Sequence, residues 1–202
     1  YSNPRKKGIY AVEIREGDKL IEARVSTGEN DILLGTRNGK SIRFSEEQIR
    51  PSGRKTMGVK GITLSSKEDR VVGMLLIKRE GTVLVATENG FGKRTEIAQY
   101  RAQKRGGKGV LTMKTTDKLG KMITIKEVVG TDDLMIIRDD GVLIRMPVSQ
   151  IRSIGRATQG VRLIKLGKGT KVSSITRIIS EEEKKTDETT KQEEDSPQPE
   201  EG

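Results

Sequence analysis

The 202-residue sequence predicts an all-β protein, a propeller-like array of four-stranded blades formed by repeats of about fifty residues. The repeat is visible in the pairs Asn38-Gly39, Asn89-Gly90 and Asp140-Gly141, which follow one another at a constant step of 51 residues. Short apolar runs rich in β-branched residues lie beside each pair, as expected for strands. The same step relates four further sets of identical residues, namely Arg43, Arg94 and Arg145; Gln48, Gln99 and Gln150; Arg54, Arg105 and Arg156; and Gly58, Gly109 and Gly160.

Each repeat is expected to contain a β-hairpin. The apolar runs 32–34, 83–86 and 134–137 each lead into an Asn-Gly or Asp-Gly pair, and a second strand-like run follows that pair. These dipeptides are the preferred central residues of type I′ turns, in which both residues have positive φ. The sequence therefore predicts three type I′ hairpins.

Two further strands complete each predicted blade. One precedes the hairpin and begins near Leu20, Val71 or Met122, and the other follows a glycine at the end of the unit. The glycines concerned are Gly8, Gly58, Gly109 and Gly160. A repeat of paired helices is the structural alternative, but the apolar runs are shorter than helices require.

The repeats occupy residues 1–179, as three whole units and a partial fourth. Because a closed ring needs at least about four blades, we expect further blades before Tyr1. Residues 180–202 differ in composition, with ten acidic residues, three lysines and no apolar residue. Such a segment cannot bury enough apolar surface to offset chain entropy, so it is predicted to be a disordered acidic tail.

Composition restricts the function classes. The chain has no Cys and no His, so we expect neither catalytic residues nor a metal site. No apolar run reaches the ~18 residues of a membrane span. The net charge is +10, and the −7 of the tail leaves +17 on residues 1–179. This charge favours a polyanionic partner, although it also serves solubility. An aromatic content of 2% argues against single-stranded nucleic acid, whose bases stack on aromatic side chains.

The main candidate site is a basic, glycine-rich loop between two apolar runs. Glycine allows the backbone to approach a ligand closely, while Lys and Arg supply charge and donors that match phosphate oxygens. The alternative is a basic turn that only joins two strands. The loop consists of Gln103, Lys104, Arg105, Gly106, Gly107, Lys108 and Gly109.

Equivalent loops of the neighbouring units also carry cations, namely Arg54, Lys60, Arg156 and Arg162. Since equivalent loops of successive blades lie side by side, these cations would form a basic belt along the rim, which suits duplex DNA. Two alternatives stay open. In the first, the arginines of the belt pair with acidic residues of neighbouring turns instead of with phosphate. In the second, the glycines that end each unit serve only a tight connection between blades.

The loop 103–109, with Tyr100-Arg101 before it, resembles the signature box of the C-terminal domain of the DNA gyrase A subunit. The segments 58–62, 89–95 and 155–162 resemble the blade connections of the same family. The resemblance implies a β-pinwheel of hairpin-swapped blades that wraps double-stranded DNA around its rim, so that ATP-driven strand passage introduces negative supercoils. It implies no catalytic residue and no cofactor in this segment, since ATP and magnesium are used elsewhere in the enzyme.

The resemblance also implies partners and a location. These are a second A subunit together with the gyrase B subunit, in an A2B2 heterotetramer, in the bacterial cytoplasm and on the chromosome. The alternatives are the related domain of the topoisomerase IV A subunit, or else a protein-interaction propeller. The principal box of the family lies in its first blade, so we interpret loop 103–109 as a later copy. The acidic tail is expected either to compete with DNA for the rim or only to increase solubility.

Overall fold

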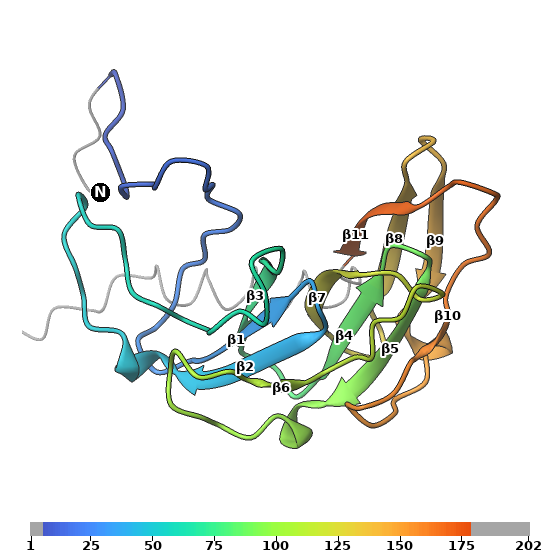
Figure 1. Cartoon of the computed structure of the whole chain (residues 1–202). Helices are drawn as coiled ribbons and strands as arrows, with labels where there is room; N and C mark the ends of the chain where they lie inside the picture. The colour runs from blue at the N-terminus through green and yellow to red at the C-terminus, as the bar shows by residue number, and fades with distance from the viewer. Residues whose placement is uncertain (1–5, 179–202) are drawn as a thin grey trace, which may run out of the picture.

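The computed structural model describes residues 6–178 and confirms the all-β prediction (Figure 1). Within this range there is no α-helix, and no helix is long and apolar enough to cross a membrane. The predicted acidic tail lies outside the described residues. The strands are β1 (Asp31–Thr36), β2 (Lys40–Ser45), β3 (Val71–Ile77), β4 (Thr82–Thr87), β5 (Phe91–Glu96), β6 (Val110–Leu111), β7 (Met122–Val128), β8 (Asp133–Arg138), β9 (Leu143–Pro147), β10 (Val161–Arg162) and β11 (Val172–Ile178). Single-turn 3-10 helices η1 (Glu46–Gln48), η2 (Ile97–Gln99) and η3 (Val148–Gln150) follow the hairpins.

The strands form three antiparallel sheets, with the orders β3-β1-β2-β6, β10-β5-β4-β7 and β11-β8-β9. Each sheet is built on one hairpin: β1–β2, β4–β5 or β8–β9. The first strand of each hairpin also pairs with a strand that follows the hairpin in the chain. We call these strands, β3, β7 and β11, the inner strands. The outer strands β6 and β10 arrive from beyond the next hairpin. Four-stranded blades are thus confirmed for two sheets, and the third has three strands in the described part of the chain.

The grouping of strands by sequence unit is wrong. The strand that begins at Val71 precedes the hairpin β4–β5, yet it pairs with β1 of the preceding hairpin. The strand that begins at Met122 pairs with β4 in the same way. Each hairpin therefore receives its inner strand from the chain that follows it, and each complete sheet joins consecutive units.

The hairpin turns also differ from the prediction. Gly39 has a φ of 81° and its N–H donates to Thr36 O at 3.0 Å, but within residues 6–178 no residue other than glycine has a positive φ. Three residues connect β1 to β2, so the glycine alone takes the left-handed conformation. The backbone N–H of Asn38 donates instead to Asp69 at 2.9 Å. The prediction of type I′ turns is therefore wrong.

The predicted strands before β1, and the one after Gly58, are not formed. Residues 9–14, 20–21 and 59–64 have no strand structure. By the pattern of the later units, such strands would pair with a hairpin that precedes β1, and the described residues contain none. Large apolar side chains of these segments are consequently exposed, among them Tyr10, Ile14, Leu20, Ile21 and Val59.

The core lies between neighbouring sheets. Strand β4 is buried on both faces: Val83 and Val85 pack toward the first sheet, and Leu84 and Ala86 pack toward the third. Such a strand reads as a continuous apolar run, because both of its faces are covered. The inner strand β7 contacts both β3 and β11, so the inner strands lie next to one another (Figure 1).

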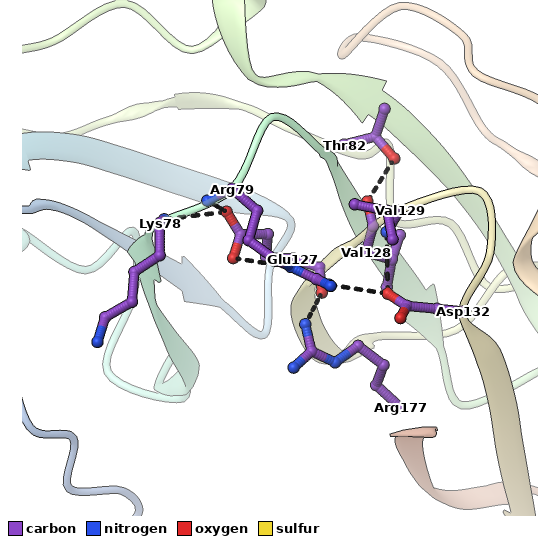
Figure 2. Close-up of polar contacts among 8 residues, drawn as sticks. All are labelled: Lys78, Arg79, Thr82, Glu127, Val128, Val129, Asp132 and Arg177. Atoms are coloured by element: carbon purple, nitrogen blue, oxygen red, sulfur yellow. Dashed lines mark hydrogen bonds and ion pairs between the residues drawn. The ribbon is translucent and has the colours of Figure 1, made fainter. Parts of the chain in front are cut away.

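A partly buried polar network joins the sheets at the ends of their inner strands (Figure 2). The guanidinium of Arg79 pairs with Asp132 at 2.9 Å, and Asp132 is only 1% exposed. Glu127 accepts hydrogen bonds from the backbone N–H groups of Lys78 and Arg79, at 3.1 and 3.0 Å. The loop after β3 is thereby connected to β7 and to the start of β8.

Candidate nucleic-acid interface

The candidate loop, which we call the box loop (residues 103–109), lies along the outer edge of the first sheet. Its path begins at a parallel bridge between Ala102 and Arg43, where the N–H of Gln103 donates to Arg43 O at 2.8 Å. It ends where β6 pairs with β2. The loop thus carries the chain from the second hairpin back to the first sheet, and this crossing places it at the rim.

Arg105 fixes the shape of the box loop. Its Nη1 donates to Lys60 O at 2.6 Å and its Nε donates to Gln48 O at 3.1 Å. The Gln48 side chain adds two bonds, accepting from the N–H of Arg105 at 2.7 Å and donating to Gln103 O at 3.3 Å. Arg105 is half-buried, and much of its donor capacity serves the loop itself.

The equivalent loop of the next unit (residues 155–160) repeats this arrangement. Arg156 Nη1 donates to Leu111 O at 3.1 Å, and its N–H donates to Gln99 Oε1 at 3.3 Å. The Arg156 guanidinium also lies 6.0 Å from the centre of the buried ring of Tyr100. Within residues 6–178, neither Arg105 nor Arg156 pairs with a carboxylate. The alternative of ion pairs with neighbouring turns is therefore wrong for these two arginines.

The support beneath the two loops differs at one position. Under the box loop lies the buried Ile42, close to Gly107. One repeat later the same register position holds Lys93, which is fully buried. Its ammonium group donates to Gly155 O at 2.6 Å, to Arg156 O, and to Thr158 Oγ1 at 3.0 Å.

These three acceptors replace the hydration that the Lys93 ammonium loses on burial. Burial, and then the positive charge of Arg156, lowers the pKa of Lys93 to about 8. The second loop is thus held by a buried charge where the box loop is held by an apolar side chain.

The remaining cations of the candidate site are exposed. Lys104 and Lys108 project from the box loop, and no hydrogen bond or ion pair holds either ammonium among the described residues. Arg54 and Lys60 lie on the exposed segment 50–60, and Arg162 is exposed with its guanidinium 5.5 Å from the centre of the Phe91 ring. The structure brings Lys60 to the box loop, since Lys60 O accepts from Arg105.

The glycines at the ends of two units serve a close approach between backbones. Gly109 has a φ of 67°, and an added Cβ would lie 2.4 Å from Ser41 O; Gly160 has a φ of 75°, and an added Cβ would lie 2.6 Å from Gly92 O. Gly58 shares the left-handed conformation, with a φ of 75°, but nothing lies within 4 Å of its Cβ position. The proposal of a tight connection is confirmed for Gly109 and Gly160.

The arginines in the second strand of each hairpin hold the blades. Arg43 pairs with Asp31 at 2.6 Å, and its Nη1 donates to Tyr100 O at 3.2 Å in the following unit. Arg94 Nε likewise donates to Ile151 O at 2.7 Å. Both side chains are therefore committed to joints between consecutive units.

Sequence reasoning assigned no role to Gln48, Gln99 or Lys93, which shape the loops. The glutamines carry a detectable signal, because they recur at the step of 51 residues. Lys93 carries the opposite signal, because it stands where the neighbouring repeats have Ile42 and Ile144. A charged residue at an apolar position of a repeat indicates a local partner.

Sheets that exchange strands between consecutive units, with basic loops along their outer edges, define a β-propeller-type domain of the hairpin-swapped pinwheel class. Solved structures share this fold. A DNA gyrase A C-terminal domain superposes with a TM-score of 0.79 at 22% identity, covering 86% of this chain and 59% of that one. The C-terminal domain of a DNA topoisomerase IV superposes with a TM-score of 0.85 at 20% identity, covering 97% of this chain and 61% of that one.

The chain belongs to the DNA gyrase C-terminal domain family. The family model, described as a DNA gyrase C-terminal domain, beta-propeller, matches residues 30–78, 81–128 and 132–178. Each match begins at a hairpin and ends with its inner strand, so it contains three strands of one sheet, while the outer strands β6 and β10 lie in the match that follows their own sheet. The resemblance seen in the sequence is thereby confirmed.

Among curated proteins, the chain is 45% identical to the DNA gyrase A subunit of Staphylococcus epidermidis over 185 residues, which is 91% of this chain and 21% of that protein. It is 44% identical to the DNA gyrase A subunit of Staphylococcus aureus strain COL over 190 residues, 93% of this chain and 21% of the relative. The chain thus spans about a fifth of the length of these relatives.

Proposed function

We propose that the chain binds double-stranded DNA along its rim and wraps it, as the DNA-wrapping part of a gyrase A subunit. The geometry of the box loop supports this proposal. Lys104 and Lys108 are exposed on a loop whose shape Arg105 and Gln48 fix, and their ammonium groups are uncommitted within the described residues. Two free cations on a rigid loop suit consecutive phosphates, which are contacted without reading base sequence.

The other predicted site residues extend this contact. Arg54, Lys60 and Arg162 are also exposed, and Lys60 lies beside the box loop, since its backbone oxygen accepts from Arg105. Arg105 and Arg156 first shape their loops and offer only their remaining N–H groups to phosphate. The backbone at Gly106 and Gly107 lets the duplex approach closely. Bending a 20–30 base-pair segment costs on the order of 1–6 kcal/mol, which several phosphate contacts offset.

In this proposal the chain acts within a larger enzyme. The curated relatives at 44–45% identity are gyrase A subunits, which favours gyrase over topoisomerase IV. The proposed partners are a second A subunit together with the gyrase B subunit, in an A2B2 heterotetramer that uses ATP to introduce negative supercoils. The proposed location is the bacterial cytoplasm, on the chromosome. ATP, magnesium and the catalytic residues would be held elsewhere, with no cofactor in this segment.

A salt series of duplex-DNA binding tests the proposal. Three proteins are compared: the chain, a Lys104→Ala/Lys108→Ala variant, and a matched control, Lys67→Ala/Lys118→Ala. The control removes two exposed cations from the loops that precede the inner strands, so both variants lose the same charge. If about six phosphates are neutralised, log K should fall against log salt with a slope near −5, and removing two contacts should reduce the slope by about 2.

We expect the box-loop variant to lose affinity and slope, and the control to retain most of both. A slope near zero for the unmodified chain would exclude rim binding and would favour a protein-interaction domain. Equal losses in the two variants would show that net charge, and not the box loop, determines binding.

A further inference from the structure

A basic hollow lies at the inner strands, away from the rim. Its volume is about 430 Å³, within the size range of small-ligand sites. The hollow is lined by four cations, one acid and uncharged side chains; the charged residues are Arg24, Lys78, Lys126, Arg177 and Glu127. Cations thus outnumber acids in the lining by four to one. The inner strands β3, β7 and β11, which contribute to the lining, belong to consecutive repeats.

The repeat explains why the cations converge. Arg24, Lys126 and Arg177 occupy the same position of the repeat, since steps of 51 residues lead from residue 24 through residue 75 to 126 and 177. The remaining member of the set is Leu75. Because β7 contacts both β3 and β11, the side chains of this register position approach the same space from successive units. Lys78, just beyond β3, adds the fourth cation.

The acids near the hollow are largely engaged. Glu22 forms an ion pair with Arg24 and accepts the N–H of Met74 at 3.1 Å. The Glu127 carboxylate accepts two backbone N–H groups and lies near the guanidinium of Arg79 (Figure 2). These carboxylates therefore leave the charge of the remaining cations incompletely balanced.

Lys126 and Arg177 are the cations with free capacity. Arg177 Nη1 donates to Glu127 O at 3.3 Å, which Figure 2 shows, and this carbonyl bears no full charge to balance the guanidinium. Lys126 Nζ has no hydrogen-bond partner among residues 6–178. Burial lowers the pKa of Lys126; Glu22 acts in the opposite direction, and the charges of Arg24 and Arg177 lower it further. The surroundings of Lys126 are thus short of negative charge.

We propose that this hollow binds a short phosphate chain, with Lys126 and Arg177 as the principal contacts. Phosphate oxygens supply both the negative charge and the acceptors that these two side chains lack. The volume accommodates a small ligand and no nucleic-acid duplex. None of the described residues that line the hollow is aromatic, so the site recognises the phosphates and not a base.

The site is distinct from the box loop and does not depend on DNA binding. Residues 103–109 do not line the hollow. An oligophosphate and a duplex are therefore expected to bind at the same time, and variants of one site should leave the other unchanged.

Calorimetric titration of the chain with sodium tripolyphosphate, and separately with magnesium-free ATP, tests the proposal. The hollow variant is Lys126→Gln/Arg177→Gln, the matched control is Lys104→Gln/Lys108→Gln, and Lys126→Arg preserves the charge. Circular dichroism verifies folding, and single Lys126→Gln serves if the double variant is unfolded. We expect one bound tripolyphosphate per chain, with roughly tenfold or greater weakening in the hollow variant because charged hydrogen bonds are lost.

The control and Lys126→Arg should stay within about threefold of the unmodified chain. ATP should bind about as tightly as tripolyphosphate, since only the phosphates are contacted. Absence of tripolyphosphate binding, or unchanged affinity in the hollow variant, would overturn the proposal. So would loss of binding in the box-loop control, which would place the ligand at the rim. Much tighter binding of ATP would exclude a site for the phosphate chain alone.

Discussion

Lys93 gives a stability prediction with a defined pH dependence. Its buried ammonium group donates to three oxygens of the loop 155–160, and its pKa is lowered from 10.5 to about 8. Lys93→Met keeps the length of the side chain but removes the charge and the donors. The loop acceptors then keep only bonds within the loop, since Gly155 O accepts from Thr158 Oγ1 at 2.9 Å and Arg156 O accepts from the N–H of Thr158 at 2.9 Å.

At pH 7 two effects of this change oppose each other. A hydrogen bond from a charged donor contributes ~1.5–3 kcal/mol, whereas removing a buried charge recovers part of its desolvation free energy. The two carbonyl acceptors belong to half-buried residues, Gly155 and Arg156, which water reaches in part. We therefore expect the variant to lose about 1.5–3 kcal/mol of unfolding free energy, close to the contribution of one hydrogen bond from a charged donor.

The sign of the pH effect follows from proton linkage. Between pH 8 and 10.5 the unfolded chain keeps the Lys93 proton while the folded protein loses it, so the unfolded state binds more protons. The stability contributed by Lys93 therefore rises with pH in this window, at about 1.4 kcal/mol per pH unit. The deficit of Lys93→Met should be constant below pH 8 and should widen by about 2 kcal/mol by about pH 9.5.

Urea denaturation at pH 7, 8 and 9.5 measures this deficit. Ile42→Met is the matched control, because it places the same side chain at the equivalent position one repeat earlier without changing a titratable group. Its small deficit should not depend on pH. A deficit of Lys93→Met that stays constant from pH 7 to 9.5 would refute the reasoning, since Lys93 would then titrate as an exposed lysine does.

Three further predictions concern the joints and the termini. Gly109→Ala should destabilise the fold by ~3 kcal/mol or more, and Gly58→Ala by only ~1 kcal/mol, because both substitutions strain a positive φ but only the first also adds a backbone clash. Urea denaturation of the two variants measures the difference, and equal losses of stability would contradict the prediction. Asp132→Asn should cost ~1.5–3 kcal/mol by thermal unfolding, since it removes the charged, buried acceptor of Arg79 while Glu127 stays near that guanidinium; a loss under ~0.5 kcal/mol would refute this. Deletion of residues 181–202 should tighten duplex binding at low salt and have little effect at high salt, because salt screens the competition between the acidic tail and DNA. Unchanged affinity at low salt would show that the tail serves only solubility.

Self-similarity made much of the fold predictable. A step of 51 residues located every hairpin, and it placed Gly109 and Gly160 at equivalent joints before any contact was known. The strand exchange was not predictable from the same pattern. An alternating or apolar run specifies which faces of a strand are buried, but it does not specify the neighbouring strand, so Val71–Ile77 was assigned to the wrong hairpin.

The sequence predicted where the candidate site lies, but not the contacts that its arginines make. The sequence placed cations and glycines at the box loop, and the structure places that loop at the outer edge of the first sheet. Arg105 and Arg156 were predicted as phosphate ligands, yet their guanidinium groups also bind backbone carbonyls of the preceding unit. Sequence spacing cannot reveal this second role, because the acceptors are main-chain atoms that every residue possesses.

Residues that keep the repeat and residues that break it have different roles. The repeated residues Arg43, Arg94, Gln48 and Gln99 hold consecutive units together, so every unit needs them. Lys104 and Lys108 are not repeated: the equivalent positions hold Gly53 and Met57 in one unit, and Gly155 and Gln159 in the other. Their free ammonium groups therefore belong to the box loop alone. Since repetition accounts for the scaffold, the departures from it locate the chemistry that is particular to one blade.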